Sequence, residues 1–139
     1  MNQTSNENIE SEFISAVDIS SYPQIELSNP VFKDNNGIPV SFLEFLKSKG
    51  INTIRIRQWV NPIDQHSSFE EVKSFAETLK SMGFKIYLSL HYSDTWADPG
   101  SQITPLEWQN VSYSTLKAIV SVSYTHLRAH ETEADLVCR

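Results

Sequence analysis

One short stretch concentrates the side chains that could do chemistry. Residues 90–100 read LHYSDTWADPG, so one His, two Asp, one Tyr and one Trp fall within eight positions. Imidazole and carboxylate groups can bind polar ligand groups or exchange protons, and a tryptophan ring can stack on a flat apolar surface. An aliphatic segment directly precedes the stretch, and loops at strand ends commonly carry binding and catalytic residues. We therefore expect residues 91–100, the motif loop, to form part of a functional site.

The elements that must position this loop alternate between strand and helix. Apolar segments at residues 13–18, 51–59 and 84–91 predict three strands. Helices are expected from Ser41 to Gly50, from Ser67 or Ser68 to Gly83, and from about Ser112, with a capping box at Ser41 and Glu44. Residues 22–40 contain three prolines and are predicted to be a loop. The repeated strand–helix order indicates right-handed βαβ units on a parallel sheet.

Side-chain alternation helps to choose between the two architectures that use such units. Ile54 and Ile56 share one face of the second predicted strand, and Arg57 lies on the other. Leu88 and His91 are separated in the same way on the third. A doubly wound sheet would need aliphatic residues on both faces, whereas a barrel lumen can become polar toward its C-terminal mouth. The alternation favours an α/β chain that forms the first three βα units of a truncated (β/α)8 TIM barrel.

The chain divides into three predicted regions. Residues 1–11 are polar and unpatterned, which predicts a disordered leader. Residues 12–121 are predicted to form the partial barrel, although a whole barrel takes about 250 residues. Residues 122–139 do not continue the apolar face of the third helix, and they resemble the translation of a sequencing adapter. We expect this last region to be a non-native tail.

Composition excludes several classes of function. The net charge of −6 and the scattered basic residues argue against a nucleic-acid-binding protein. Apolar segments are too short to span a membrane, and the first residues lack a signal-peptide pattern. The single Cys138 excludes a disulfide framework within the chain.

The motif loop and two earlier segments carry a family resemblance. Residues 90–102 read LHYSDTWADPGSQ, residues 52–59 read NTIRIRQW and residues 16–20 read AVDIS. Over about residues 13–121 the chain resembles glycoside hydrolase family 53, the arabinogalactan endo-β-1,4-galactanases. The resemblance implies a (β/α)8 barrel that cuts internal β-1,4-galactosyl bonds in pectic galactan with retention of configuration. It also implies two catalytic glutamates at the ends of the fourth and seventh strands, so neither is expected in this chain.

The resemblance also implies roles for residues near the predicted strand ends. Arg57 is expected to hydrogen-bond the nucleophilic glutamate, and His91 to donate to it or to a sugar hydroxyl. Candidate substrate-binding residues are Asp18, Trp59, Asp94, Trp96 and Asp98. Each has a structural alternative. These are an interior salt bridge for Arg57, a hydrogen-bonded structural role for His91, rim packing for the tryptophans, an interstrand hydrogen bond for Asp18 and turn capping for the other two aspartates.

The remaining expectations concern partners and rival functions. The expected partner is β-1,4-galactan, acted on by a full-length monomer that needs no cofactor, although some bacterial family members carry calcium in a later loop. Family members act outside the cell, so a secreted or extracytoplasmic location is expected. One alternative is a fragment of a metal-dependent hydrolase barrel that uses His91, Asp94 and Asp98. Another is a fragment without any function, and the 139-residue chain itself is expected to be inactive.

Overall fold

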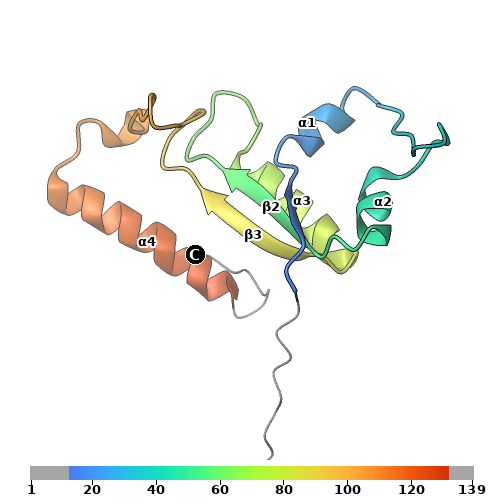
Figure 1. The fold of residues 1–139 in the computed structure, drawn as a ribbon. Helices are drawn as coiled ribbons and strands as arrows, with labels where there is room; N and C mark the ends of the chain where they lie inside the picture. Colours follow the sequence, from blue (N-terminus) through green and yellow to red (C-terminus); the bar gives the residue numbers. More distant parts are fainter. Residues whose placement is uncertain (1–12, 132–139) are drawn as a thin grey trace, which may run out of the picture.

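A three-stranded parallel sheet forms the centre of the molecule (Figure 1). The computed structural model describes residues 13–131, with side chains described through residue 123. Strands β1 (Ala16–Asp18), β2 (Thr53–Gln58) and β3 (Lys85–Leu90) lie side by side in chain order, with Ile54 paired to Val17 on one side and to Ile86 on the other. Since parallel neighbours end at the same edge, the carboxyl ends of all three strands converge there. The predicted leader lies outside the described residues.

Helix α3 (Phe69–Ser81) covers one face of this sheet and packs against β2 and β3. Ile54 and Ile56 of β2 and Ile86 of β3 are fully buried beneath it, together with Leu79 of the helix. Burying such a side chain contributes about 1.5–3 kcal/mol, so this contact dominates the local core. The predicted alternation is confirmed: the aliphatic residues face the helix, and Arg57 lies on the opposite face.

A cluster of stacked aromatic rings joins the first two helices to α3. Helices α1 (Tyr22–Glu26) and α2 (Phe42–Ser48) meet where the Tyr22 ring lies 5.3 Å from the Phe42 ring, and Phe75 of α3 lies 5.7 Å from Tyr22. The prediction of a continuous loop over residues 22–40 is therefore wrong at α1. Pro23 occupies the first turn of that helix, where a missing N–H costs no hydrogen bond.

The ends of the helices were predicted with mixed success. Ser41 precedes α2 but its side chain makes no capping hydrogen bond, so the predicted capping box does not form there. Ser68 does cap α3, since its hydroxyl accepts from the Glu71 N–H at 3.3 Å. Gly50, which follows α2, has the left-handed φ of 84° that suits glycine, as the stop signal predicted.

Beyond β3 the chain passes through the short 3-10 helix η1 (Leu106–Trp108) into α4 (Tyr113–Glu131). Helix α4 starts where expected, with the Ser112 hydroxyl accepting from the Thr115 N–H at 3.2 Å. Its backbone continues past residue 121, where the predicted native region ends. A helical backbone does not distinguish native from foreign sequence, so the non-native tail stays a prediction. Residues 132–139 of that tail lie outside the described residues.

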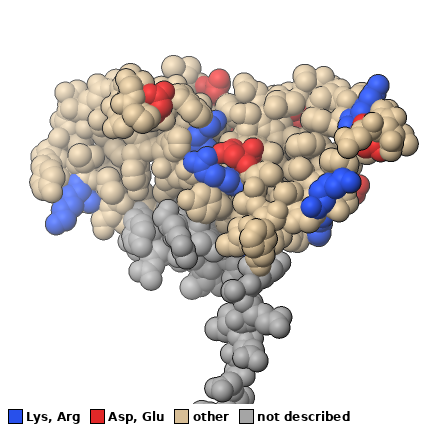
Figure 2. Space-filling view, viewed as in Figure 1, with Lys and Arg blue, Asp and Glu red and all other residues tan. Residues whose placement is uncertain are grey.

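Charged side chains are sparse on the open face of the sheet. Figure 2 shows blue and red side chains in small, separated groups over this view, with one mixed group near its middle. No broad basic patch is visible on this face. Within the described part of the chain, no helix has the length and apolar character needed to cross a membrane.

Candidate functional site

Arg57 lies between two tryptophan rings at the carboxyl ends of the strands. Its guanidinium carbon is 4.9 Å from the centre of the Trp59 ring and 4.8 Å from that of Trp96. Trp59 directly follows β2, and Trp96 belongs to the motif loop after β3. A planar guanidinium suits this sandwich because it can stack on aromatic faces. The arrangement explains why two distant segments meet over the open face of the sheet.

The same arginine lacks a full set of hydrogen bonds among the described residues. Arg57 is only 8% exposed, and its Nε atom is buried without a partner. Burial lowers the pKa of Arg57 from its usual value, an effect that the Asp18 carboxylate opposes and the Arg55 cation reinforces. A buried N–H without an acceptor reduces the stability of the folded state, so we expect this Nε–H to donate to an anion or another acceptor in the whole protein.

His91 follows β3, and it too has a buried nitrogen atom without a hydrogen-bond partner among the described residues. This atom is Nδ1, and the His91 ring lies edge-on to Trp96 at 6.3 Å. Burial, and then the neighbouring Arg57 and Arg55 cations, lower the pKa of His91 below its usual 6.5. The imidazole is therefore neutral at pH 7 and can donate one hydrogen bond without adding a charge.

A polar row crosses the sheet next to these two side chains. Asp18 at the end of β1 forms an ion pair with Arg55 of β2, and the Arg55 Nη2 donates to the Ser89 hydroxyl of β3 at 2.9 Å. Burial raises the pKa of Asp18, but hydrogen bonds from Ser20 and the Arg55 cation outweigh it, so the net shift is downward. Asp18 thus pairs with Arg55, whereas no ion pair links Arg57 to another described residue.

Asp94, in the loop after β3, connects the loop after β2 with the start of η1. Its Oδ1 accepts from the Asn61 N–H at 3.0 Å, and its Oδ2 accepts from the Leu106 N–H at 2.8 Å. The backbone N–H of Val60 donates to the Ser93 carbonyl at 2.9 Å, beside the same junction. Both carboxylate oxygens are thus engaged by backbone donors, which favours a loop-positioning role over direct ligand contact.

Asp98 fixes the orientation of Trp96. The Trp96 indole Nε1 donates to Asp98 Oδ2 at 3.1 Å, and the Gly100 N–H donates to Asp98 Oδ1 at 2.7 Å. The Trp96 ring is 54% exposed, so it is held in place yet remains open to a ligand. Asp98 therefore both closes the turn and positions the ring.

Two hollows flank the site. One of about 540 Å³ is lined by the motif loop, from His91 to Pro99, and by the residues that follow it, among them Gln102. The other, of about 210 Å³, lies at the end of β1 against Asp18 and Arg57. The first has the size of ordinary small-ligand pockets. Polar groups, aromatic rings and hollows therefore gather at one edge of the sheet.

Comparison with known proteins identifies the family to which the chain belongs. The sequence model described as glycosyl hydrolase family 53 matches residues 14–136. The chain belongs to this family. The match runs beyond residue 121, although the origin of residues 122–139 stays a prediction.

Curated relatives and solved structures agree with the family assignment. The chain is 42% identical over 99 residues to an arabinogalactan endo-β-1,4-galactanase A of Emericella nidulans, covering 71% of this chain and 28% of that protein. Among solved structures, the Ignisphaera aggregans family 53 catalytic domain matches with a TM-score of 0.75 and 35% identity, over 88% of this chain and 37% of that one. A structure of fungal β-1,4-galactanases matches with a TM-score of 0.64 and 36% identity, over 69% and 29%. The chain spans little more than a third of these proteins at most.

These matches confirm the predicted fold class. The three parallel strands with their helices correspond to part of the family 53 (β/α)8 barrel. In a barrel the open face of the sheet is the lumen, and the converging strand ends form the mouth where active sites lie. The predicted placement of Arg57 and His91 at this mouth agrees with the geometry.

The structure brings most of the candidate residues together and adds others. The predicted residues Arg57, Trp59, His91 and Trp96 form one group, with Asp18, Asp94 and Asp98 around it. Sequence reasoning left out Arg55 and Ser89, although strand alternation puts both on the lumen face. It also assigned nothing to His66, whose ring lies 5.8 Å from that of Trp59; no sequence pattern indicates this contact.

The arrangement of acidic and imidazole groups bears on the metal-site alternative. Among the side chains that the structure describes, within residues 13–123, no three from His, Cys, Asp or Glu group closely enough to hold a metal ion. Asp94 and Asp98 instead accept hydrogen bonds from nearby backbone and indole N–H groups. The described residues therefore do not bring His91, Asp94 and Asp98 together as a set of metal ligands.

Proposed function

We propose that the whole protein hydrolyses internal β-1,4-galactosidic bonds in galactan and arabinogalactan with retention of configuration. The observation that carries this proposal is the group at the barrel mouth. A buried cation, Arg57, lies between two tryptophan rings and beside the neutral imidazole of His91. The group occurs in a family 53 chain whose relatives are named as galactanases.

The chemistry needs two carboxyl groups that act in turn. In a retaining glycosidase, one carboxylic acid protonates the leaving glycosidic oxygen while a carboxylate attacks the anomeric carbon from the other side. Water, deprotonated by the first group, then releases the sugar from the covalent intermediate. We expect both groups to be glutamates at the ends of the fourth and seventh strands.

Arg57 and His91 support this chemistry. The buried Nε–H of Arg57 requires an acceptor, and the nucleophilic carboxylate would supply one at the barrel mouth. A cation beside that carboxylate keeps it ionised and oriented for attack. His91 is uncharged, so it can donate to the nucleophile or to a sugar hydroxyl without competing for the carboxylate as a second cation.

The surrounding residues bind the substrate. Trp59 and Trp96 provide apolar faces for stacking on the C–H face of galactose. Asp18 and Asp98 contribute carboxylates beside the two hollows. Asp94 acts by holding the loops in place, because its two oxygens accept from backbone N–H groups of separate segments, at Asn61 and Leu106.

The proposal extends to partners and location. The substrate is a pectic polysaccharide, and the enzyme acts as a monomer outside the cell. The reaction itself uses no cofactor. Calcium, if bound as in some bacterial family members, would stabilise a loop and take no part in bond cleavage.

Incubation of the whole protein with linear β-1,4-galactan tests the proposal. We expect short galacto-oligosaccharides, and ¹H NMR should show the β-anomer as the first product. The Arg57→Ala variant serves as the control for contaminating enzymes and should lose most of the activity. Absence of cleavage, or an α-anomer released first, would contradict the proposal. Activity that is lost with EDTA and restored by zinc but not by calcium would favour the metal-dependent alternative.

A further inference from the structure

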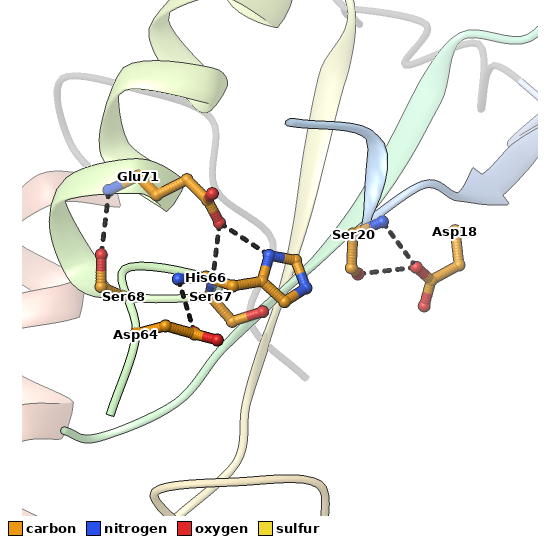
Figure 3. A network of polar contacts seen from close by, with 7 residues as sticks. All are labelled: Asp18, Ser20, Asp64, His66, Ser67, Ser68 and Glu71. Atoms are coloured by element: carbon orange, nitrogen blue, oxygen red, sulfur yellow. Dashed lines mark hydrogen bonds and ion pairs between the residues drawn. The ribbon is translucent and has the colours of Figure 1, made fainter. Parts of the chain in front are cut away.

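A polar network at the start of α3 holds the His66 side chain (Figure 3). Glu71 Oε2 accepts from the Ser67 N–H at 2.7 Å and lies 3.2 Å from His66 Nδ1. The backbone N–H of His66 donates to Asp64 Oδ1 at 3.0 Å. The His66 side chain is 11% exposed and that of Glu71 20%. Since a carboxylate only accepts, Nδ1 is the donor, and the imidazole is fixed by a hydrogen bond in a largely buried place.

The backbone at this point adopts a conformation that most residues avoid. Ser67 has a φ of 58° and is completely buried. A left-handed conformation at a residue other than glycine costs energy and persists only where neighbouring contacts impose it. Here it directs the Ser67 N–H to Glu71, while the Ser67 carbonyl accepts from the Trp59 N–H at 2.8 Å. The start of α3 is thereby connected to the residue that follows β2.

The imidazole contacts Trp59 directly. The two ring centres are 5.8 Å apart and the planes meet at 83°, which is the favoured edge-to-face geometry of aromatic pairs. Arg57 lies against the same indole, with its guanidinium carbon 4.9 Å from the ring centre. The Trp59 ring is therefore packed by a cation from β2 and by an imidazole from the loop before α3.

The two tryptophans differ in how they are held. Asp98 accepts a hydrogen bond from the Trp96 indole, which orients that ring. The Trp59 indole Nε1 is buried and has no hydrogen-bond partner among the described residues. Among the described residues, packing must therefore orient Trp59, and His66 supplies an edge-to-face ring contact to it.

We propose that His66, fixed by Glu71, is a positioning residue that orients Trp59 for stacking on the sugar. The proposal rests on the substrate-binding role given to Trp59 above. It assigns a function to the loop before α3, which acts through its contact with Trp59. Loss of the imidazole should let the Trp59 ring rotate and weaken stacking, while the catalytic groups stay in place.

Steady-state kinetics of the whole protein on galacto-oligosaccharides tests this role. His66→Ala should raise KM by about 3- to 10-fold and change kcat by less than about 2-fold. In a Trp59→Ala background, the same substitution should change KM by less than about 2-fold, because the residue through which it acts is gone. Glu71→Ala should resemble His66→Ala. The matched control is Glu70→Ala, an exposed carboxylate on the same helical turn, which should leave both constants unchanged.

A second measurement does not depend on activity. The indole N–H resonance of Trp59, assigned by its absence in Trp59→Phe, should shift in His66→Ala and stay unchanged in Glu70→Ala. An active protein in which His66→Ala leaves KM and this resonance unchanged would overturn the proposal. So would an equal rise in KM with and without Trp59, since that marks a general structural effect. If the whole protein does not cleave galactan, the proposed function fails, and the resonance alone decides whether His66 orients Trp59.

Discussion

Replacement of Asp94 by alanine separates a loop-positioning role from a sugar-binding role. The substitution removes two hydrogen bonds, from the Asn61 N–H at 3.0 Å and from the Leu106 N–H at 2.8 Å. Hydrogen bonds to charged groups contribute about 1.5–3 kcal/mol when buried, but both donors lie on solvent-accessible loops, so about 1 kcal/mol each is appropriate. The free energy of unfolding of the whole protein should therefore fall by about 2 kcal/mol.

The same substitution should also weaken substrate binding indirectly. Asp94 joins the loops after β2 and β3, which carry Trp59 and Trp96. Without it the two rings should lose their common geometry, and we expect KM to rise together with the loss of stability. Urea denaturation followed by intrinsic fluorescence gives the free energy of unfolding. Initial rates on galacto-oligosaccharides give KM.

Asp98→Ala is the matched control, because it removes a carboxylate from the same loop. Its partners, Trp96 and Gly100, lie two residues away on either side, so its hydrogen bonds do not join separate loops. We expect a loss of about 0.5–1 kcal/mol. If Asp94→Ala raised KM while the unfolding free energy stayed within about 0.5 kcal/mol of wild type, the loop-positioning role would be refuted and direct sugar contact supported.

Four further predictions concern the same site. Arg57→Ala should lower kcat by about 10²-fold or more, as expected for loss of transition-state charge stabilisation, and should raise KM by a smaller factor, about 3- to 10-fold, because the same guanidinium packs on both tryptophan rings; a change in KM as large as that in kcat would argue against it. Trp96→Ala should raise KM by about 5- to 10-fold with little change in kcat, and an unchanged KM would count against stacking there. Burial and the nearby arginine cations lower the pKa of His91 in the native state below 6.5. Between 6.5 and that lower pKa the unfolded chain is protonated at His91 and the native state is not, so the free energy of unfolding should fall as the pH falls through this range. An NMR titration should find a higher His91 pKa in Arg57→Met than in wild type. The 139-residue chain by itself should neither cleave galactan nor melt cooperatively, because three βα units leave a sheet edge and the lumen face open; either activity or a sharp melt would prove this wrong.

The order of strands and helices was predictable because it depends on local patterns. Alternating apolar residues in β2 and β3 predict strands with one buried face, and the spacing of Val72, Phe75 and Leu79 predicts the buried side of α3. Helix α1 was missed, since a helix of five residues with a proline in its first turn has too short a pattern to distinguish it from a loop. Its place is determined by the stacking of Tyr22 on rings from two other helices.

The sequence by itself determined which chemical groups gather at the barrel mouth. The positions of Arg57 and His91 near strand ends follow from strand alternation and length, and parallel strands bring those ends to one edge. The motif loop and the two earlier segments, residues 16–20 and 52–59, also carried the family resemblance, which the family match confirms.

Only the tertiary structure decided which of these groups touch. The Trp59–Arg57–Trp96 sandwich, the Asp94 bridge between loops and the contact of His66 with Trp59 all join segments separated along the chain. Such contacts depend on the register of β2 against β3 and on the paths of the loops that follow. Local sequence patterns carry no information about distances between loops, so the roles of Asp94 and His66 became visible only once those loops were placed side by side.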